Sequence, residues 1–161
     1  MGLTNDLKKS YRPALIIALA ILGSLAVYIG LAMLLKASRP GHRPLLAGRT
    51  AYTLRLVFYG FSILQVIVIR LMRGAFFQQA PGLDGRSLGR RLMLISILSS
   101  VFSEVPALLG FILFLVAGFT WDMYALVFVS LVLVFMFFPR FRNWEEWAAE
   151  QQSLGPADSR P

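Results

Sequence analysis

Four long apolar segments, separated by short polar stretches, set the pattern of the chain, and they cover residues 14–35, 51–77, 92–119 and 123–138. A helix needs about 20 residues to cross a bilayer, with a range of roughly 17 to 25. The first and third segments reach this length on their own, and the fourth reaches it with its flanking residues. The pattern therefore predicts four transmembrane helices, at about 14–36, 51–77, 92–119 and 121–139.

The second segment is the least regular of the four. Only residues 56–69 are free of charge, between Arg55 and Arg70. Long arginine side chains can extend to the membrane surface while their backbone lies deeper. We therefore expect the second helix to cross the membrane as well.

Residues 1–13 and 154–161 are polar ends outside the predicted bundle. The first stretch predicts a lead-in, with Pro13 in the first turn of the helix that follows, where the missing amide hydrogen is tolerated. The last stretch has the composition of a disordered tail.

Residues 140–153 have a different pattern. Phe141, Trp144 and Trp147 recur at helical spacing, opposite a face with glutamates. This spacing is typical of an amphipathic helix that lies on the membrane surface. A helix that docks on a partner protein is the alternative interpretation.

Composition supports the membrane assignment. The chain has 161 residues and is 57% hydrophobic, and its mean hydropathy is +0.68. A soluble domain of this size could not bury so much apolar surface. The sequence therefore predicts an all-α integral membrane protein, with four transmembrane helices and a C-terminal amphipathic surface helix.

The net charge of +8 indicates topology rather than nucleic-acid binding, because the basic residues flank the apolar segments. With four crossings, both termini share one side, which then holds 11 of the 16 basic residues: Lys8, Lys9, Arg12, Arg70, Arg73, Arg86, Arg90, Arg91, Arg140, Arg142 and Arg160. The basic loop around residues 36–55 argues the other way. On balance we expect a protein of a bacterial inner membrane with both termini in the cytoplasm.

Most catalytic and cofactor chemistry lacks the residues it needs. The chain has one histidine, His42, and no cysteine, so paired haem ligands and the common zinc motifs are excluded. No phosphate-binding glycine loop or nucleophile turn occurs. The sequence predicts neither an enzyme nor a cofactor or metal site.

Glu104 is the one acidic residue in the interior of a predicted membrane span, close to the midpoint of the third helix. A charged side chain at the bilayer centre costs about 2.5 to 3.5 kcal/mol on insertion scales. We therefore expect Glu104 to be protonated or paired, and to be able to bind a proton or a cation. Its possible partners are Ser100 and Ser103 on its own helix, Tyr59, Ser62 and Gln65 on the second helix, and Ser24 and Tyr28 on the first.

Pro106 and small residues mark the surroundings of Glu104. Proline at this position leaves the carbonyl of Phe102 without its helical donor. Small residues at near-helical spacing predict close helix contacts; they include Ser96, Ala107 and Gly110 on the third helix and Gly23, Ala26 and Gly30 on the first. Aromatic residues at the ends of the spans predict interfacial anchors at Trp121, Tyr124, Trp144 and Trp147.

The stretch VFSEVPALLGFILFL resembles the carboxylate-bearing helix of the rotary ATPase proteolipid subunit, the c subunit of the F, V and A types. The resemblance covers about residues 94–118. In that family a Glu or Asp follows a small residue in mid-membrane, and a glycine commonly stands six positions later. Ser103, Glu104 and Gly110 occupy those positions. The resemblance implies that Glu104 binds a proton or cation and that the basic loop before this helix faces the cytoplasm.

Two functions remain open at this point. In the first, the chain is a subunit of a multi-protein or oligomeric membrane complex, and Glu104 binds or relays a proton or cation. In the second, the chain is a structural subunit, and Glu104 is a buried anchor between helices or between chains. Both predict contacts with the lipid bilayer and with further copies or other membrane subunits, and neither involves nucleic acid.

Overall fold

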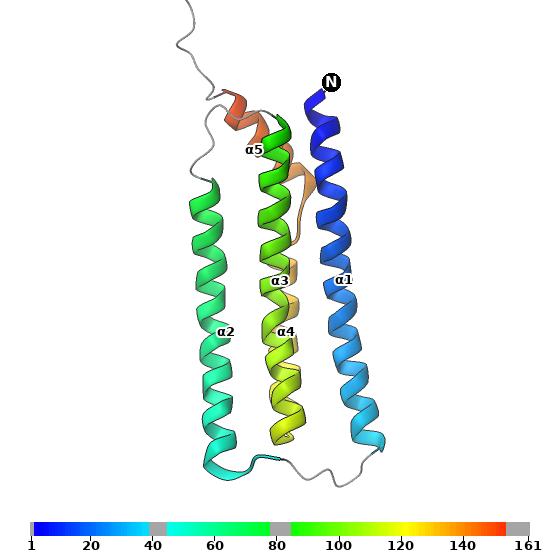
Figure 1. The fold of residues 1–161 in the computed structure, drawn as a ribbon, viewed down its shortest axis with the longest axis vertical. Helices are drawn as coiled ribbons and strands as arrows, with labels where there is room; N and C mark the ends of the chain where they lie inside the picture. Colours follow the sequence, from blue (N-terminus) through cyan, green and yellow to red (C-terminus); the bar gives the residue numbers. More distant parts are fainter. Residues whose placement is uncertain (1, 39–44, 78–84, 154–161) are drawn as a thin grey trace, which may run out of the picture.

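The computed structural model describes residues 2–38, 45–77 and 85–153, which form five helices (Figure 1). These are α1 (Gly2–Ser38), α2 (Gly48–Phe77), α3 (Gly85–Ala117), α4 (Thr120–Phe137) and α5 (Phe141–Ser153). The described part of the chain contains no strand. Four helices hold a stretch long and apolar enough to cross a membrane: Leu7–Ser38, Gly48–Ala75, Gly89–Ala117 and Thr120–Phe137. The predicted all-helical architecture with four such helices is confirmed.

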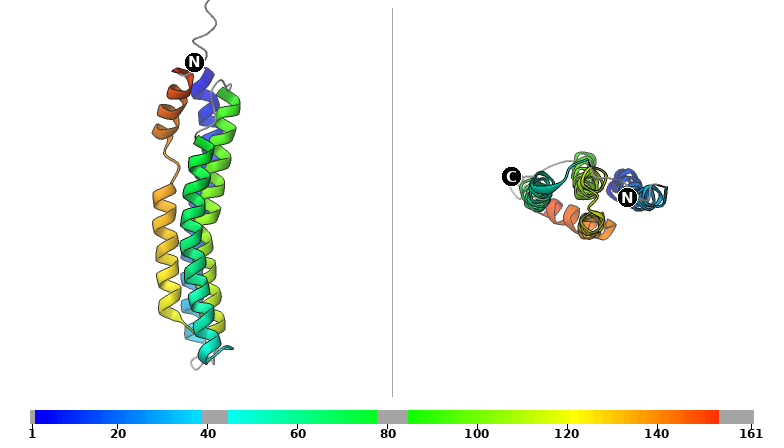
Figure 2. Two further views of the ribbon diagram at one scale, coloured as in Figure 1. Left: turned by 90° about the vertical axis from the view of Figure 1, so that its left-hand side faces the viewer. Right: turned by 90° about the horizontal axis from the view of Figure 1, so that it is seen from below.

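The helix α3 occupies the centre of the bundle. It runs between α1 and α2, and α4 covers a further side of it (Figures 1 and 2). Its residue Ala107 is fully buried against Leu25 of α1 and Val127 of α4. Further along, Leu113 packs on Ala51 of α2. Within the described residues α1 and α2 make no contact with each other, and both pack mainly on α3.

Gly110 allows α4 to approach α3 closely. A Cβ atom at this position would lie 2.9 Å from Cβ of Leu126 and 3.2 Å from the carbonyl oxygen of Met123. Real Cβ atoms almost never come this close to another atom, so a larger residue would push the two helices apart. The helix contact predicted for Gly110 is therefore made inside the chain, with α4.

Apolar side chains cover the outside of the bundle. Ile16 on α1, Ile63 on α2 and Phe128 on α4 are all exposed, together with many others on these faces. Soluble monomers rarely expose contiguous apolar surface on this scale. The exposed surface is thus of the kind that a lipid bilayer covers.

Several helix boundaries differ from the sequence prediction. α1 begins at Gly2, so Pro13 lies inside the helix and most of the predicted lead-in is helical. The reason is a tertiary contact, because Leu7 is buried against Leu92 and Trp144. The end of α4 differs as well. It lies at Phe137 instead of residue 139, because Pro139 disfavours a helical conformation at the residue before it. The predicted tail at 154–161 lies outside the described residues.

The start of α3 also differs. It begins at Gly85 instead of residue 92. Its first turns carry Arg90 and Arg91, which favour a helix although they are charged. Apolar patterning therefore located the span of α3 but not the polar extension before it.

The aromatic face of α5 packs on the ends of α1 and α3. Tyr11 of α1 donates a hydrogen bond of 3.1 Å to the carbonyl of Pro139, and its ring contacts Phe141 and Trp144 edge-on. Trp144 is only 5% exposed. It is covered by the protein itself, in contrast to the interfacial anchor that the sequence predicted, because Leu7 and Leu92 offer it an apolar site.

Candidate functional site

Glu104 of α3 is attached to α1 by two hydroxyl groups. Its oxygen Oε1 accepts a hydrogen bond of 2.5 Å from Ser24 and one of 2.7 Å from Tyr28. These two donors lie one turn apart on the same face of α1. The ring of Tyr28 stacks on Phe111 of α3, with centroids 5.6 Å apart, and this contact holds the Tyr28 hydroxyl near the carboxyl group. The side chain of Glu104 therefore links the middle of α3 to the middle of α1.

The Ser24 hydroxyl has two acceptors within reach but only one hydrogen atom. Its oxygen lies 2.8 Å from the carbonyl oxygen of Ile21 and 2.5 Å from Oε1 of Glu104. When Glu104 is ionised, Ser24 donates to the carboxylate. When Glu104 is protonated, its O–H can donate to Ser24, and Ser24 then donates to Ile21. Tyr28 donates to Glu104 in both cases, so rotation of one hydroxyl satisfies both protonation states.

Pro106 leaves a backbone carbonyl of α3 free to accept a hydrogen bond from a neighbouring helix. Since proline has no amide hydrogen, the carbonyl of Phe102 lacks its helical donor. The side-chain amide of Gln65 on α2 donates to this carbonyl. The backbone amide of Ala107 donates a bond of 2.8 Å to the hydroxyl of Ser130 on α4. Between Phe102 and Ala107, side-chain hydrogen bonds thus join α3 to all three neighbouring helices.

The partners predicted for Glu104 on α2 bind elsewhere. Gln65 donates to the backbone of Phe102, Ser62 donates to the carbonyl of Phe58 in its own helix, and Tyr59 binds a different carboxylate. Phe102 packs against residues of α2 and α4. Two residues along a helix correspond to a rotation of about 200°. Glu104 therefore points away from α2 and toward α1.

The two partners predicted for Glu104 on α3 itself, Ser100 and Ser103, are both buried. The hydroxyl of Ser103 donates to the carbonyl of Ser99, at 2.7 Å. Ser100 is 3% exposed. Among the described residues, no hydrogen bond joins either predicted serine to Glu104; the Ser103 hydroxyl instead binds the carbonyl four residues before it, as hydroxyls in helices readily do.

A second polar cluster lies at the end of the bundle where α2 begins and α3 turns into α4. Nε of Arg55 lies 2.9 Å from Oδ1 of Asp122, and the hydroxyl of Tyr59 donates to the same oxygen at 2.9 Å. Asp122 is 7% exposed. Arg55, Tyr59 and Asp122 were not predicted from the sequence to form a cluster. The available signal was their opposite charge at the same predicted end of two neighbouring spans.

The two small-residue faces differ in what they contact. On α3, Ala107 is fully buried and Ser96 is 7% exposed, and Gly110 meets α4 as described above. On α1, Gly23 and Gly30 have open space where a Cβ would lie, and Ala26 between them is exposed. The predicted packing face of α3 is therefore occupied within the chain, and the corresponding face of α1 is free in this single chain.

The remaining aromatic residues predicted as anchors lie in three settings. Trp121 is 87% exposed at the start of α4. Tyr124, on the same helix, is partly buried and lines a cavity described below. Trp147 of α5 is partly buried against the ends of α1 and α3. Only Trp121 has the open exposure expected of a residue at a membrane surface.

No protein-family profile, curated protein or solved structure matches this chain.

Proposed function

We propose that this chain is an integral membrane protein in which Glu104 binds and releases a proton within the bundle. The observation that carries the proposal is the hydrogen-bond pair from Ser24 and Tyr28 to a single oxygen of Glu104. A carboxyl group in the membrane interior is tolerated when it is neutral or hydrogen-bonded. The Ser24 hydroxyl gives Glu104 a hydrogen-bond partner both when the carboxyl group is protonated and when it is ionised. The resemblance of the Glu104 helix to the proteolipid carboxylate helix supports the same role.

A proton suits the site better than a metal cation does. Metal ions such as calcium and magnesium need about six or more oxygen ligands, several of them carboxylates or waters. The described residues contain no group of three or more His, Cys, Asp or Glu side chains placed to hold a metal ion. Glu104 supplies one carboxylate, and its two neighbours are hydroxyls that already act as donors. We therefore name a proton as the ion.

We further propose that the chain works as a subunit of an oligomer or a larger membrane complex. A single carboxyl group can hold a proton, but transport needs access from both sides of the membrane. The support for a further subunit is the free face of α1 at Gly23, Ala26 and Gly30, because small residues allow another helix to approach closely. This face lies on the same helix as Ser24 and Tyr28. At about 100° of rotation per residue, this face lies nearly opposite Ser24 and Tyr28 around α1, so a helix that packs there would contact the side of α1 that faces away from Glu104.

A structural role for Glu104 is the second candidate function. The observation in its favour is that the same two hydrogen bonds fasten α1 to α3. In this case Glu104 stays in one protonation state, and its bonds serve only to orient α1. The two functions differ in whether the carboxyl group exchanges its proton in the folded protein.

Labelling with a hydrophobic carbodiimide tests the proposed function, since the reagent modifies protonated carboxyl groups in membranes. In native membranes we expect modification at Glu104, with a rate that falls as the pH rises. Glu104→Gln provides the unlabelled reference, and the exposed Glu145 and Glu146 on α5 provide carboxyl groups outside the spans. A Glu104 that reacts only after the chain is stripped from its partners supports the anchor role and contradicts proton exchange.

A further inference from the structure

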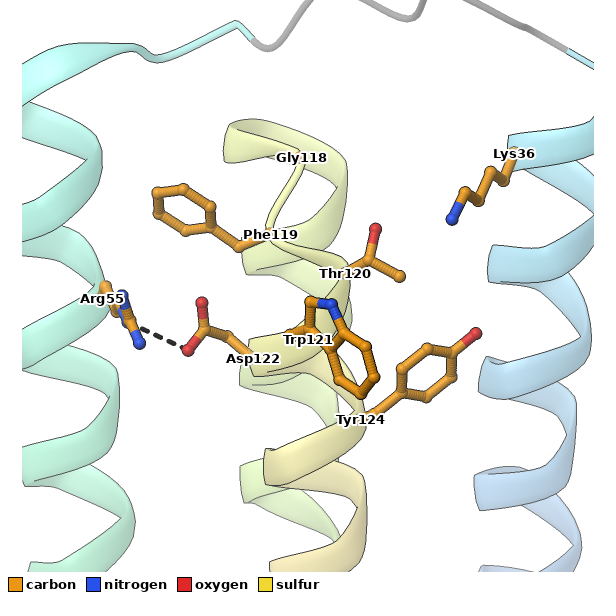
Figure 3. Close-up of a pocket in the computed structure, with 8 residues that line it drawn as sticks. All are labelled: Lys36, Arg55, Gly118, Phe119, Thr120, Trp121, Asp122 and Tyr124. Carbon is orange, nitrogen blue, oxygen red and sulfur yellow. Dashed lines mark ion pairs between the residues drawn. The ribbon is translucent and has the colours of Figure 1, made fainter.

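A cavity of about 520 Å³ lies at the end of the bundle, beside the turn between α3 and α4. Figure 3 shows that side chains from three helices surround it: Lys36 from α1, Arg55 from α2, and Thr120, Asp122 and Tyr124 from α4. Lys36 lies about two turns along α1 from Tyr28, and the cavity shares no residue with the Glu104 site. The cavity is therefore separate from the Glu104 site.

The charges that line the cavity favour an anion. Lys36 and Arg55 carry positive charge and Asp122 carries negative charge, so the lining has a net charge of +1. Asp122 is already engaged, because its Oδ1 binds both Arg55 and Tyr59. Lys36 points toward the cavity (Figure 3), and in the described part of the chain it makes no hydrogen bond or ion pair. The unmatched charge in the cavity is thus the ammonium group of Lys36.

Hydroxyl groups supply the remaining polar surface. Thr120 and Tyr124 line the cavity together with Lys36. Ammonium, guanidinium and hydroxyl groups are the donors that bind phosphate oxygens in proteins. The side chains that surround this cavity therefore match a phosphate group in both charge and hydrogen-bond capacity.

The position of the cavity identifies the source of the phosphate. Lys36 is near the end of the apolar span Leu7–Ser38, and Thr120 begins the span Thr120–Phe137. In a membrane, the ends of the spans lie at the level of the lipid headgroups. Trp121, beside the cavity, is 87% exposed, and tryptophan is enriched at that level. A phospholipid alongside the bundle would present its phosphate at the depth of Lys36.

We propose that this cavity binds the phosphate group of an anionic phospholipid, with Lys36 as the principal contact and Arg55 as the second cation. The inference rests on the membrane insertion proposed above but not on the role of Glu104. Arg55 is held by Asp122 and so presents its remaining guanidinium N–H groups in a fixed position. The bound lipid would join α1 to α2 and α4 at this end of the bundle.

Binding of lipids to the purified full-length protein, measured by native mass spectrometry, tests the proposal. The probes are phosphatidylglycerol, which is anionic, and phosphatidylcholine, which has no net charge. We expect preferential binding of phosphatidylglycerol, and Lys36→Gln should weaken it by about fivefold, the effect of one basic residue near an anionic lipid. Lys9→Gln is the matched control, because Lys9 is also exposed on α1 but lies at the opposite end of the helix.

The outcomes separate the sources of the phosphate. If millimolar inorganic phosphate displaces phosphatidylglycerol from the wild type but not from Lys36→Gln, the cavity is a phosphate site filled from solution, and the lipid assignment is overturned. Equal binding of the two lipids, or equal losses in Lys36→Gln and Lys9→Gln, overturns the site itself. None of these results changes the carbodiimide labelling of Glu104. Both proposals rest on membrane insertion, and extraction of the protein from membranes by alkaline carbonate would overturn that insertion.

Discussion

Arg55→Gln is expected to destabilise the folded bundle by about 2 to 4 kcal/mol, because it leaves a buried carboxylate without its cation. The side chain of Asp122 is 9% exposed and would retain only the hydrogen bond from Tyr59. We place the effect below the full cost of breaking a buried ion pair because the Arg55 side chain is 41% exposed, so water already weakens the pair. Unfolding in detergent, followed by circular dichroism, measures the change.

Asp122→Asn should cost clearly less than Arg55→Gln. The asparagine keeps an acceptor for Tyr59, and the Arg55 guanidinium can turn toward the cavity and the solvent. Arg142→Gln is the control, because its ion pair with Glu146 is exposed on both sides and its loss should leave stability unchanged. Equal losses in Arg55→Gln and Asp122→Asn would show that Asp122 is not held as a buried carboxylate.

Gln65→Leu is expected to cost about 1 to 2 kcal/mol, because it removes the donor that satisfies the Phe102 carbonyl opposite Pro106. We place the cost in the lower part of the range for a buried hydrogen bond because Oε1 of Gln65 is buried and has no partner among the described residues. Leucine removes this unpaired oxygen, which offsets part of the stability lost with the hydrogen bond. The decisive comparison is with the same substitution in a Pro106→Ala background. Alanine restores a backbone donor to Phe102, so Gln65→Leu should then cost much less.

Ser62→Ala is the matched control for Gln65→Leu. Ser62 is also 4% exposed on α2, but its hydroxyl binds only the backbone of its own helix. Its cost should be the same with proline or alanine at position 106. If Gln65→Leu is likewise insensitive to the residue at 106, the amide does not compensate for the proline.

The length of the apolar segments was enough to predict four helices long and apolar enough to cross a membrane, because bilayer thickness sets the length that a span requires. It could not predict that α1 begins at Gly2, because that extension depends on the contact between Leu7 and Trp144, which are distant in sequence. The same limit applies to Trp144. Its spacing in α5 predicted an apolar face but could not identify the surface that the face covers.

The sequence also separated Glu104 from the other acidic residues but did not select its partners. Ser24 and Tyr28 were two of several candidates, and the choice among them depends on the side of α3 on which α1 packs. Pro106 predicted the free carbonyl of Phe102, yet Gln65 was named only as a possible partner of Glu104 and not as the donor to that carbonyl. Local rules predicted which groups need a partner, and the packing of the helices determined which partner each group has.

Infrared spectroscopy across a pH titration tests the central claim most directly, since a protonated carboxyl group has its own carbonyl band. Subtraction of the Glu104→Gln spectrum isolates the band of Glu104. We predict a band that disappears reversibly as the pH rises while the protein stays folded, and that changes frequency in Tyr28→Phe, which lacks one of the two hydrogen bonds. A Glu104 that keeps a single protonation state throughout the range in which the protein is folded would contradict the account.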